Sequence, residues 1–417
     1  MTRSIHRSLA EAGLPPLQRT AWVEVDIDQL QANATALGHL TAPAALGPVV
    51  KADGYGHGLE VSARCAVAAG ASWLCVADIG EAERLRTDGY KGRVLVLYPV
   101  PTSALATMSR LEVDVSVGTL DSAVSTAHGD HPALAAHLEI DTGMTRGGVA
   151  PADAVQAATT LATGPGARLA GVWTHLAAPE DGEMTATQMA LFRSTLHQLE
   201  SNGIDPGVTH ASASGGILAL EDRLDLVRPG LAFYGLHPGA GSALPPEIRP
   251  ALALRAIPVR LVEVPTGTSV GYAGTWVAER PSRIATVPVG YADGWARSSS
   301  PGTFALVSGQ RVPVVGRVSS DSLTVDVTDA DAGPDSPVTL IGGDGDEVVT
   351  ADEVAIARGT ISWEVLQQLG ARLSRVYDSD GRPIALRQES SAQLIVAPGA
   401  PLPGYEVPPL SPNTPTA

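Results

Sequence analysis

Lysine is nearly absent from this sequence. Of its 28 lysines and arginines, only Lys51 and Lys91 are lysines, so any chemistry that needs a reactive amine must use one of these two side chains. Cysteine is equally rare. Cys65 and Cys75 lie in apolar, alanine-rich sequence, which is typical of small core side chains, and they indicate no disulfide framework.

Positive charge is also in short supply. The formal net charge of -16 excludes a broad basic surface for nucleic acid or for an anionic membrane, although a locally positive pocket can still hold a small anion. We therefore expect a small-molecule partner, and neither nucleic acid nor a membrane. We expect no metal site.

Long apolar runs are missing as well. No run is long and uncharged enough to span a bilayer, and the first twenty residues, MTRSIHRSLAEAGLPPLQRT, have no apolar core of signal-peptide length. The cytoplasm is the expected location. Charged residues make up 17% of the chain and hydrophobic residues 44%, which is typical of a folded globular protein. A length of 417 residues predicts two packed units.

The first of these units reads as a parallel barrel. Between Trp22 and Pro238, short β-branched or apolar runs alternate with helix-like stretches rich in alanine, leucine and glutamate. The expected strands are 48–51, 73–77, 94–97, 113–117, 136–141, 171–175, 208–212 and 226–228. This is about the number that closes a (β/α)8 TIM barrel.

The sequence changes in character after Pro250. Runs such as IATVPVGYA and LTVDVTD are separated by Gly, Pro and Asp turns, which predicts a mostly β domain, with helix-like segments at ADEVAIARG and WEVLQQLGARL. The fold class is therefore α/β plus β. We expect an N-terminal extension (1–21), a barrel (22–248), a β-rich C-terminal domain (249–387) and a disordered proline-rich tail (388–417).

The two lysines have different surroundings. Lys91 lies in DGYKG, a turn-like segment that keeps an amine solvated and protonated. Lys51 follows the apolar run LGPVV and precedes ADGYGHG, so it lies where a strand ends and a loop begins, which is the catalytic face of a parallel barrel. Lys51 is the candidate for Schiff-base chemistry, and the alternative is a lysine that extends from a strand end into solvent.

Other polar groups follow the expected strands. Arg146 lies in LEIDTGMTRGG and Arg228 in LVRPG, and buried charges of this kind require a ligand or an ion-pair network. His175 ends GVWTH and either stacks on a planar ring or is an ordinary buried side chain. The segments HASASGGIL and VRPGLAFYG offer backbone N–H groups and hydroxyls for a phosphate, although such loops are often simple turns.

Taken together, these segments resemble the alanine racemases. The similarity runs from Trp22 to Tyr377 and follows the family's motifs in order. The matching segments are WVEVDIDQL, VVKADGYGHG, LEIDTGMTRGG, the TH of GVWTHLA, HASAS, LVRPGLAFYGL, SVGYAGTW, VPVGYADGW, GRVSSD and TISWEV. The resemblance implies a pyridoxal 5'-phosphate (PLP) enzyme with a barrel and a β-rich domain that racemises a small amino acid as a homodimer.

The resemblance also implies the catalytic residues. Lys51 would bind PLP and act as one base, and Tyr272 in SVGYAGTW would act as the other base from the opposite face of the substrate. Tyr272 and Asp321 would serve the Lys51 of the partner chain. Arg228 would face the pyridine nitrogen, which stays unprotonated because arginine does not readily give up a proton. His175 would stack on the ring.

The same likeness assigns the remaining cofactor contacts. Tyr55, Ser214 and Gly230 match phosphate-binding positions, as does Trp363 in TISWEV, where the family has a tyrosine that also narrows the substrate entrance. Substrate contacts would come from Arg146, from Tyr272 and from the backbone N–H of Ser320 in VSSD, where the family usually has methionine.

Two further positions depart from the family pattern. Glu139 stands where the family commonly has a lysine, often modified to a carbamate that holds the arginine matching Arg146. We hypothesise that the Glu139 carboxylate replaces this modification, since it already carries the negative charge. Ala213 replaces a frequent asparagine. The departures surround the substrate and leave the lysine unchanged.

Three functions are compatible with these residues. The first is alanine racemisation for D-alanine supply. The second is racemisation of another amino acid in a specialised pathway, which the altered pocket residues keep open. The third is PLP binding without turnover, against which Tyr272 and the β-rich domain argue. Related PLP decarboxylases have a cysteine-containing motif near the substrate, and VSSD has none.

Overall fold

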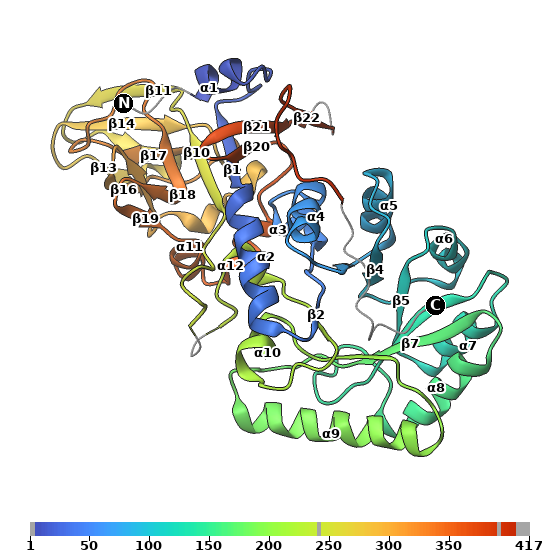
Figure 1. The fold of residues 1–417 in the computed structure, drawn as a ribbon. Coiled ribbons are helices and arrows are strands. Elements are labelled where there is room, and N and C mark those ends of the chain that lie inside the picture. Colours follow the sequence, from blue (N-terminus) through green and yellow to red (C-terminus); the bar gives the residue numbers. More distant parts are fainter. Residues whose placement is uncertain (1–4, 240–242, 390–392, 406–417) are drawn as a thin grey trace. The chain divides into compact units, whose positions relative to one another are not determined.

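The computed structural model describes residues 5–239, 243–389 and 393–405, and the chain folds into two compact units. The barrel unit consists of Leu30–Gly54, Leu59–Arg249 and the segment from Pro403 onward. The β unit consists of the described residues up to Gln29, of Tyr55–Gly58 and of Pro250–Leu402. The course of the chain can be followed by colour in Figure 1.

The barrel unit is built on parallel strands. Six of them pair in the order β3-β4-β5-β6-β7-β8, and β2 pairs with β9. Single bridges join Val49 to Cys75 and Ala213 to Arg228, so the two groups of strands close into one ring of eight. The strands are β2 (Ala45–Leu46), β3 (Trp73–Val76), β4 (Arg93–Val96), β5 (Asp114–Val117), β6 (Leu134–Glu139), β7 (Ala167–Trp173), β8 (Val208–His210) and β9 (Leu226–Val227). The predicted fold class is confirmed.

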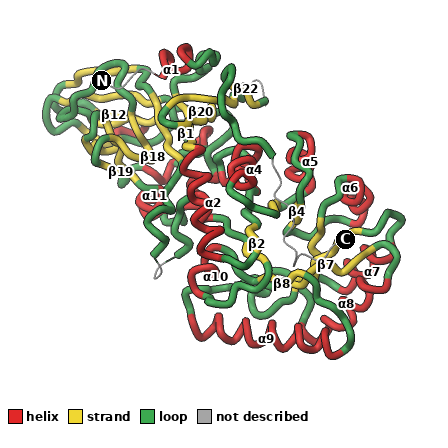
Figure 2. The backbone as a smooth tube through the Cα atoms, in the orientation of Figure 1, coloured by secondary structure: helices red, strands yellow, loops and turns green. Residues whose placement is uncertain are grey.

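Most residues of the barrel strands are buried, and β3 and β5 are buried along their whole length, as expected of a parallel sheet covered by helices. The helices alternate with these strands along the chain, as Figure 2 shows. Polar caps begin several of them: Asp78 caps α5, Thr119 forms a capping box on α7, and Asp181 caps α9. The helices are α2 (Ile27–Thr41), α3 (Lys51–Tyr55), α4 (Leu59–Ala68), α5 (Ile79–Thr87), α6 (Leu105–Arg110), α7 (Leu120–His128), α8 (Ala154–Thr163), α9 (Gly182–Ser201) and α10 (Ser214–Ala219).

The β unit contains one large mixed sheet. Its strand order is β11-β14-β17-β16-β15-β18-β10-β1-β20-β21-β22, with β19 paired to β18, and β12 and β13 form a separate pair. The strands are β1 (Ala21–Asp26), β10 (Leu252–Ala256), β11 (Arg260–Val264), β12 (Ser269–Val270), β13 (Trp276–Val277), β14 (Ser282–Val287), β15 (Phe304–Val307), β16 (Gln310–Val315), β17 (Leu323–Asp326), β18 (Val338–Asp344), β19 (Glu347–Val349), β20 (Ser374–Ser379), β21 (Arg382–Arg387) and β22 (Leu394–Val396). The two expected helical segments form α11 (Ala351–Arg358) and α12 (Ser362–Gln367).

Strand β1 joins the β unit although its sequence was assigned to the barrel. It pairs antiparallel with β10 and parallel with β20, so it completes a sheet whose other strands come from the far end of the chain. Helix α1 (Ile5–Glu11), which precedes β1, also belongs to the β unit, because Leu9 packs in one core cluster with Trp22 and Leu386. The precise domain boundaries given from the sequence stay predictions.

Part of the proline-rich tail is ordered. Strand β22 pairs with β21 in the β unit, and in the barrel unit Tyr405 donates a hydrogen bond of 2.6 Å to Asp88 and packs on Arg64. The expectation of a disordered tail is therefore wrong for residues 393–405. This segment pairs with a strand of the β unit, and its Tyr405 packs against the ion pair between Arg64 and Asp88. Residues 406–417 lie outside the described residues. Within those described, no helix has both the length and the apolar surface to cross a membrane.

Candidate active site

Lys51 lies at the catalytic end of the barrel strands. The chain leaves β2, Val49 bridges to Cys75 at the end of β3, and Lys51 follows two residues later. Its amine is partly buried, and this burial together with the charge of Arg146 lowers the pKa of Lys51, while Glu81 opposes the shift. A lowered pKa makes more of the unprotonated, nucleophilic amine available near neutral pH.

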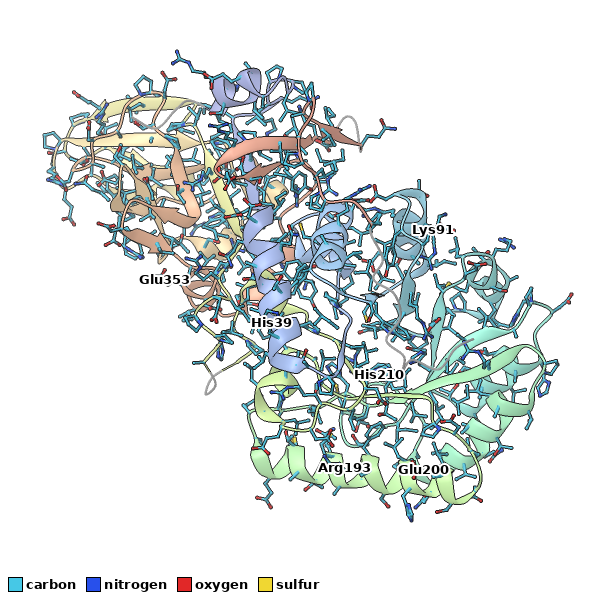
Figure 3. All side chains as sticks on the ribbon, in the orientation of Figure 1. His39, Lys91, Arg193, Glu200, His210 and Glu353 are labelled. Carbon is cyan, nitrogen blue, oxygen red and sulfur yellow. The ribbon has the colours of Figure 1, made fainter. Side chains whose placement is uncertain are left out.

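Lys91 is not in a comparable position. It is exposed in the turn between α5 and β4 (Figure 3). The choice of Lys51 over Lys91 as the reactive amine therefore agrees with the burial of the two side chains.

A left-handed turn follows Lys51. Ala52, Asp53 and Gly54 have φ of 52°, 54° and 62°, a conformation that costs energy for residues with a Cβ. The turn is held at both ends. Glu81 accepts a 2.6 Å hydrogen bond from the backbone N–H of Ala52, and Arg84 donates one of 2.9 Å to Asp53. Strain of this kind persists only where the surroundings impose it, which is typical of a functional site.

Tyr98 lies beside two of the positive groups of the site. Its ring centre lies 5.7 Å from Lys51 Nζ and 5.8 Å from Arg146 Cζ, within the range of cation–π attraction. The sequence analysis missed this residue. The available signal was its place directly after the β4 run VLVL, at the same end of the barrel as Lys51.

Arg228 is buried in the barrel interior. Only 2% of it is exposed, and it donates hydrogen bonds to Nδ1 of His210 at 2.5 Å and to the carbonyl oxygen of Thr174 at 3.1 Å. Its guanidinium also lies 4.8 Å from the Trp173 ring centre. Burial lowers the pKa of Arg228 to about 10, so the group remains a cation at neutral pH. His210, which ends β8 and is labelled in Figure 3, was missed by the sequence analysis.

The pKa of His175 is shifted by the charges of three nearby cationic side chains. Burial first, and then the charges of Arg228, Arg146 and Lys51, lower the pKa of His175 to about 3. The imidazole is therefore neutral at any working pH. The structure thus brings Lys51, Arg146, His175 and Arg228 into one electrostatic neighbourhood.

Glu139 supplies the negative charge of this neighbourhood. It ends β6, is 6% exposed, and has a raised pKa because burial outweighs the opposing charges of Arg146 and Arg228. Space around it is tight, since a Cβ on Gly147 would lie 2.9 Å from its Oε2. A Cβ on Gly147 would therefore displace the end of the Glu139 side chain from its present position.

A loop with hydroxyl and backbone donors lies next to the Lys51 strand in the ring, since β9 pairs with β2 and the N–H of Val49 donates to the carbonyl oxygen of Pro229. Ser214, the first residue of α10, accepts hydrogen bonds from the backbone N–H of Gly230 at 3.0 Å and of Ala232 at 3.1 Å. The hydroxyl of Ser212 is buried and has no partner among the described residues. A small anion could replace these internal contacts.

The other expected site residues belong to the β unit. Tyr272 begins a short turn and is 70% exposed, an unusual state for a tyrosine. Asp321 forms a 2.8 Å ion pair with Arg372. Ser320 is half-buried beside it, and Trp363 is half-buried in α12. Tyr55 ends the turn after Lys51, with φ of 51°.

The closed barrel and the perturbed lysine define a barrel enzyme that acts on a small molecule. Among the described residues, no cluster of three or more His, Cys, Asp or Glu side chains is placed to hold a metal ion. Family models for the N-terminal and C-terminal domains of alanine racemase match residues 25–238 and 251–377. The chain belongs to the alanine racemase family and is an isomerase.

Individual relatives cover almost the whole chain. An alanine racemase of Thermobifida fusca is 36% identical over 366 residues, which are 86% of this chain and 98% of the relative. One of Desulfovibrio desulfuricans is 35% identical over 86% of this chain and 98% of its own length. The solved structure of alanine racemase from Bacillus anthracis with bound L-Ala-P has a TM-score of 0.86 at 31% identity, covering 91% of this chain and all of that one.

Proposed function

We propose that this protein interconverts L- and D-alanine with pyridoxal 5'-phosphate bound to Lys51, for D-alanine biosynthesis. The observation that carries the proposal is the lowered pKa of Lys51 at the catalytic end of the barrel, among Arg146, His175 and Arg228. When bound, PLP supplies the electron sink that makes the α-proton of an amino acid acidic.

The residues present fit this cofactor. Lys51 would hold it covalently, and Arg228 would face its ring nitrogen, since a buried guanidinium can only donate there. Its phosphate would be held by Tyr55, Ser214, Gly230 and Trp363. The two backbone N–H groups that now point at the Ser214 hydroxyl support this assignment. A neutral His175 can lie against an aromatic ring without adding a further positive charge.

Proton movement would use two groups on opposite faces of the substrate. The Lys51 amine would take or return the α-proton on one face, and the Tyr272 hydroxyl would do so on the other. Arg146 and the backbone N–H of Ser320 would orient the substrate. Inversion follows because one group removes the α-proton and the other donates its own proton to the opposite face of the α-carbon.

The second base would come from a partner chain in a homodimer. The high exposure of Tyr272 supports this, because a tyrosine that acts in catalysis needs a protein environment that excludes water. Asp321, also exposed, would accompany it. We place the enzyme in the cytoplasm, where PLP and free amino acids are available, and fractionation of the producing cell would test this.

The identity of the substrate depends on the pocket positions that differ from the family pattern. A paralogous racemase for another amino acid would have the same Lys51 and Tyr272, and Ser320, Trp363 and Ala213 are the positions where its pocket would differ. A PLP-binding protein without turnover would also bind cofactor at Lys51. These alternatives predict different results in one assay.

That assay follows the optical activity of single-enantiomer amino acids with the PLP-loaded protein. We expect inversion of L-alanine and D-alanine, with serine and larger amino acids slower. Faster inversion of another amino acid would identify the paralogue. Cofactor binding without inversion of any amino acid tested would identify a binding protein and overturn the proposal.

A further inference from the structure

A line of hydrogen-bonded side chains crosses the interior of the barrel unit. From Arg228 it passes to His210, whose Nε2 lies 2.8 Å from Nδ1 of His137. It continues to Asp114, whose Oδ2 lies 3.2 Å from Nε2 of His137. Both imidazoles are fully buried, and Asp114 is 7% exposed.

The line spans the barrel from one end to the other. Asp114 is the first residue of β5 and Arg228 follows the last residue of β9. Because the strands are parallel, the first lies at the end of the barrel remote from Lys51 and the second lies at the catalytic end. His137, in the middle of β6, connects the two.

The positions of the protons along the line follow from the groups at its ends. A guanidinium has only donors, so Nδ1 of His210 must accept and its proton must sit on Nε2. That proton is donated to Nδ1 of His137, so the proton of His137 is also on Nε2, where it is donated to Asp114. Each of the three hydrogen bonds in the line is then donated in the same direction, from Arg228 toward Asp114.

The charge states agree with this arrangement. Burial lowers the pKa of both imidazoles and keeps them neutral, more strongly for His210, which also faces Arg228. Burial alone would raise the pKa of Asp114, but its hydrogen bond to His137 and the charge of Arg93 outweigh it and lower that pKa. Asp114 is therefore the ionised acceptor at the end of the line.

Surrounding residues fix the rings in place. Trp173 stacks on His210 with an angle of 5° between the planes, and Trp73 meets His137 edge-on at 5.4 Å. Gly171 leaves the space for the contact between the histidines, because a Cβ there would lie 2.4 Å from Nδ1 of His137. These contacts favour the present planes of both imidazole rings.

We propose that Asp114 is a positioning residue for Arg228: by accepting the proton of His137 it fixes the tautomer of both histidines and keeps the lone pair of His210 aimed at Arg228. The proposal rests on the proposed function, which gives Arg228 its place at the cofactor ring. Without the carboxylate, the Nε2–H of His137 is buried without an acceptor, and the tautomer in which His137 carries its proton on Nδ1 becomes populated. In that tautomer His210 carries its proton on the nitrogen that faces Arg228, so two donors meet, and Arg228 keeps only its carbonyl acceptors, such as that of Thr174.

The test reads the tautomers directly. The PLP-loaded protein is labelled with ¹⁵N-histidine, and its imidazole nitrogens are assigned with His137→Gln and His210→Gln. We expect both residues to carry the proton on Nε2 in the unmodified protein. In Asp114→Leu, which removes the acceptor but keeps a branched side chain, we expect His210 signals of the other tautomer to appear although His210 makes no hydrogen bond to residue 114.

Arg93→Gln is the matched control. Arg93 forms a 2.6 Å ion pair with Asp114, so this change disturbs the same end of the barrel but leaves the carboxylate in place. Its histidine signals should not change. Asp114→Asn provides a second variant of the same shape if Asp114→Leu fails to fold, and there we expect smaller shifts in the same direction.

Several results would overturn the proposal. These are a proton on Nδ1 of His210 in the unmodified protein, unchanged His210 signals in both Asp114 variants, or equal changes in Arg93→Gln.

Turnover gives a second measurement: kcat of Asp114→Leu should fall about tenfold with KM changed less than twofold, as the loss of about one buried hydrogen bond predicts. An unchanged kcat would also contradict it. The tautomers are measured without substrate, so this measurement tests the role of Asp114 even if the protein does not racemise alanine.

Discussion

The side chain of Glu81 accepts a hydrogen bond of 2.6 Å from the backbone N–H of Ala52, the residue next to Lys51. The second oxygen of the same carboxylate accepts one of 2.7 Å from the N–H of Ala77, just after β3. One glutamate therefore ties the strained turn after Lys51 to the end of a barrel strand. Glu81 also raises the pKa of Lys51 through its charge, against the effect of burial.

Replacing Glu81 by glutamine should weaken this tie. Glutamine has a single side-chain oxygen, so one of the two N–H groups faces an NH₂ group and loses its acceptor. We expect the free energy of unfolding in urea to fall by about 2 kcal/mol. The pKa of Lys51 should fall as well, which moves the midpoint of PLP binding to lower pH.

Glu83→Gln is the control for this variant, because Glu83 is exposed on the same helix. It removes the same charge without touching the turn and should change neither quantity. Equal effects of the two changes would show that helix charge, and not the tie to Ala52, is responsible.

His175 predicts a pH dependence of stability. Its pKa is 6.5 when unfolded and about 3 in the folded chain, so between these values the unfolded state binds one proton more. Stability must therefore fall as the pH falls through this window, by up to ~1.4 kcal/mol per pH unit for this residue. His175→Gln, which does not titrate, should show a correspondingly smaller loss between pH 6 and 4 in urea unfolding. An identical loss in both proteins would show that His175 is not held neutral.

Glu139 predicts independence from carbon dioxide. A carboxylate at this position needs no modification to carry a negative charge beside Arg146. Racemisation in a preparation stripped of CO₂ should equal that in bicarbonate buffer. Glu139→Lys should be less active in the stripped preparation and recover on adding bicarbonate. Bicarbonate stimulation of the unmodified protein would contradict the hypothesis that Glu139 replaces a carbamate.

Sharing of the site between two chains predicts that two inactive variants restore activity together. Lys51→Ala and Tyr272→Phe each lose one base. Refolding them as a mixture produces mixed dimers in which one site has both residues, so an equal mixture should regain roughly a quarter of the full activity. Each variant alone is the control. If the mixture stays as inactive as its components, both bases belong to the same chain.

Much of the site could be predicted from the sequence because its signals are local. The scarcity of lysine and the apolar run before Lys51 identified the candidate amine, and the strand-end positions of Arg146, His175 and Arg228 placed them near it. Seven of the eight expected barrel strands overlap the observed ones. The first pairs at Ala45–Leu46 instead of 48–51, and only Val49 of the expected segment makes a bridge.

What the sequence could not predict depends on contacts between distant segments. The hydrogen bonds that link Asp114, His137 and His210 require three strands to be in register. The position of Tyr98 beside Lys51 depends likewise on how β4 is placed in the barrel. Strand β1 has an ordinary alternating pattern, and its partners β10 and β20 lie more than two hundred residues away. No local pattern reports such pairing.

In the proposed mechanism Lys51 takes part in inverting alanine, and chiral chromatography of a reaction with pure L-alanine tests this role. We predict that the PLP-loaded protein converts L-alanine to an equal mixture of both enantiomers and that Lys51→Ala produces no D-alanine. L-alanine left unchanged by the unmodified protein, or racemised by Lys51→Ala as well, would contradict it.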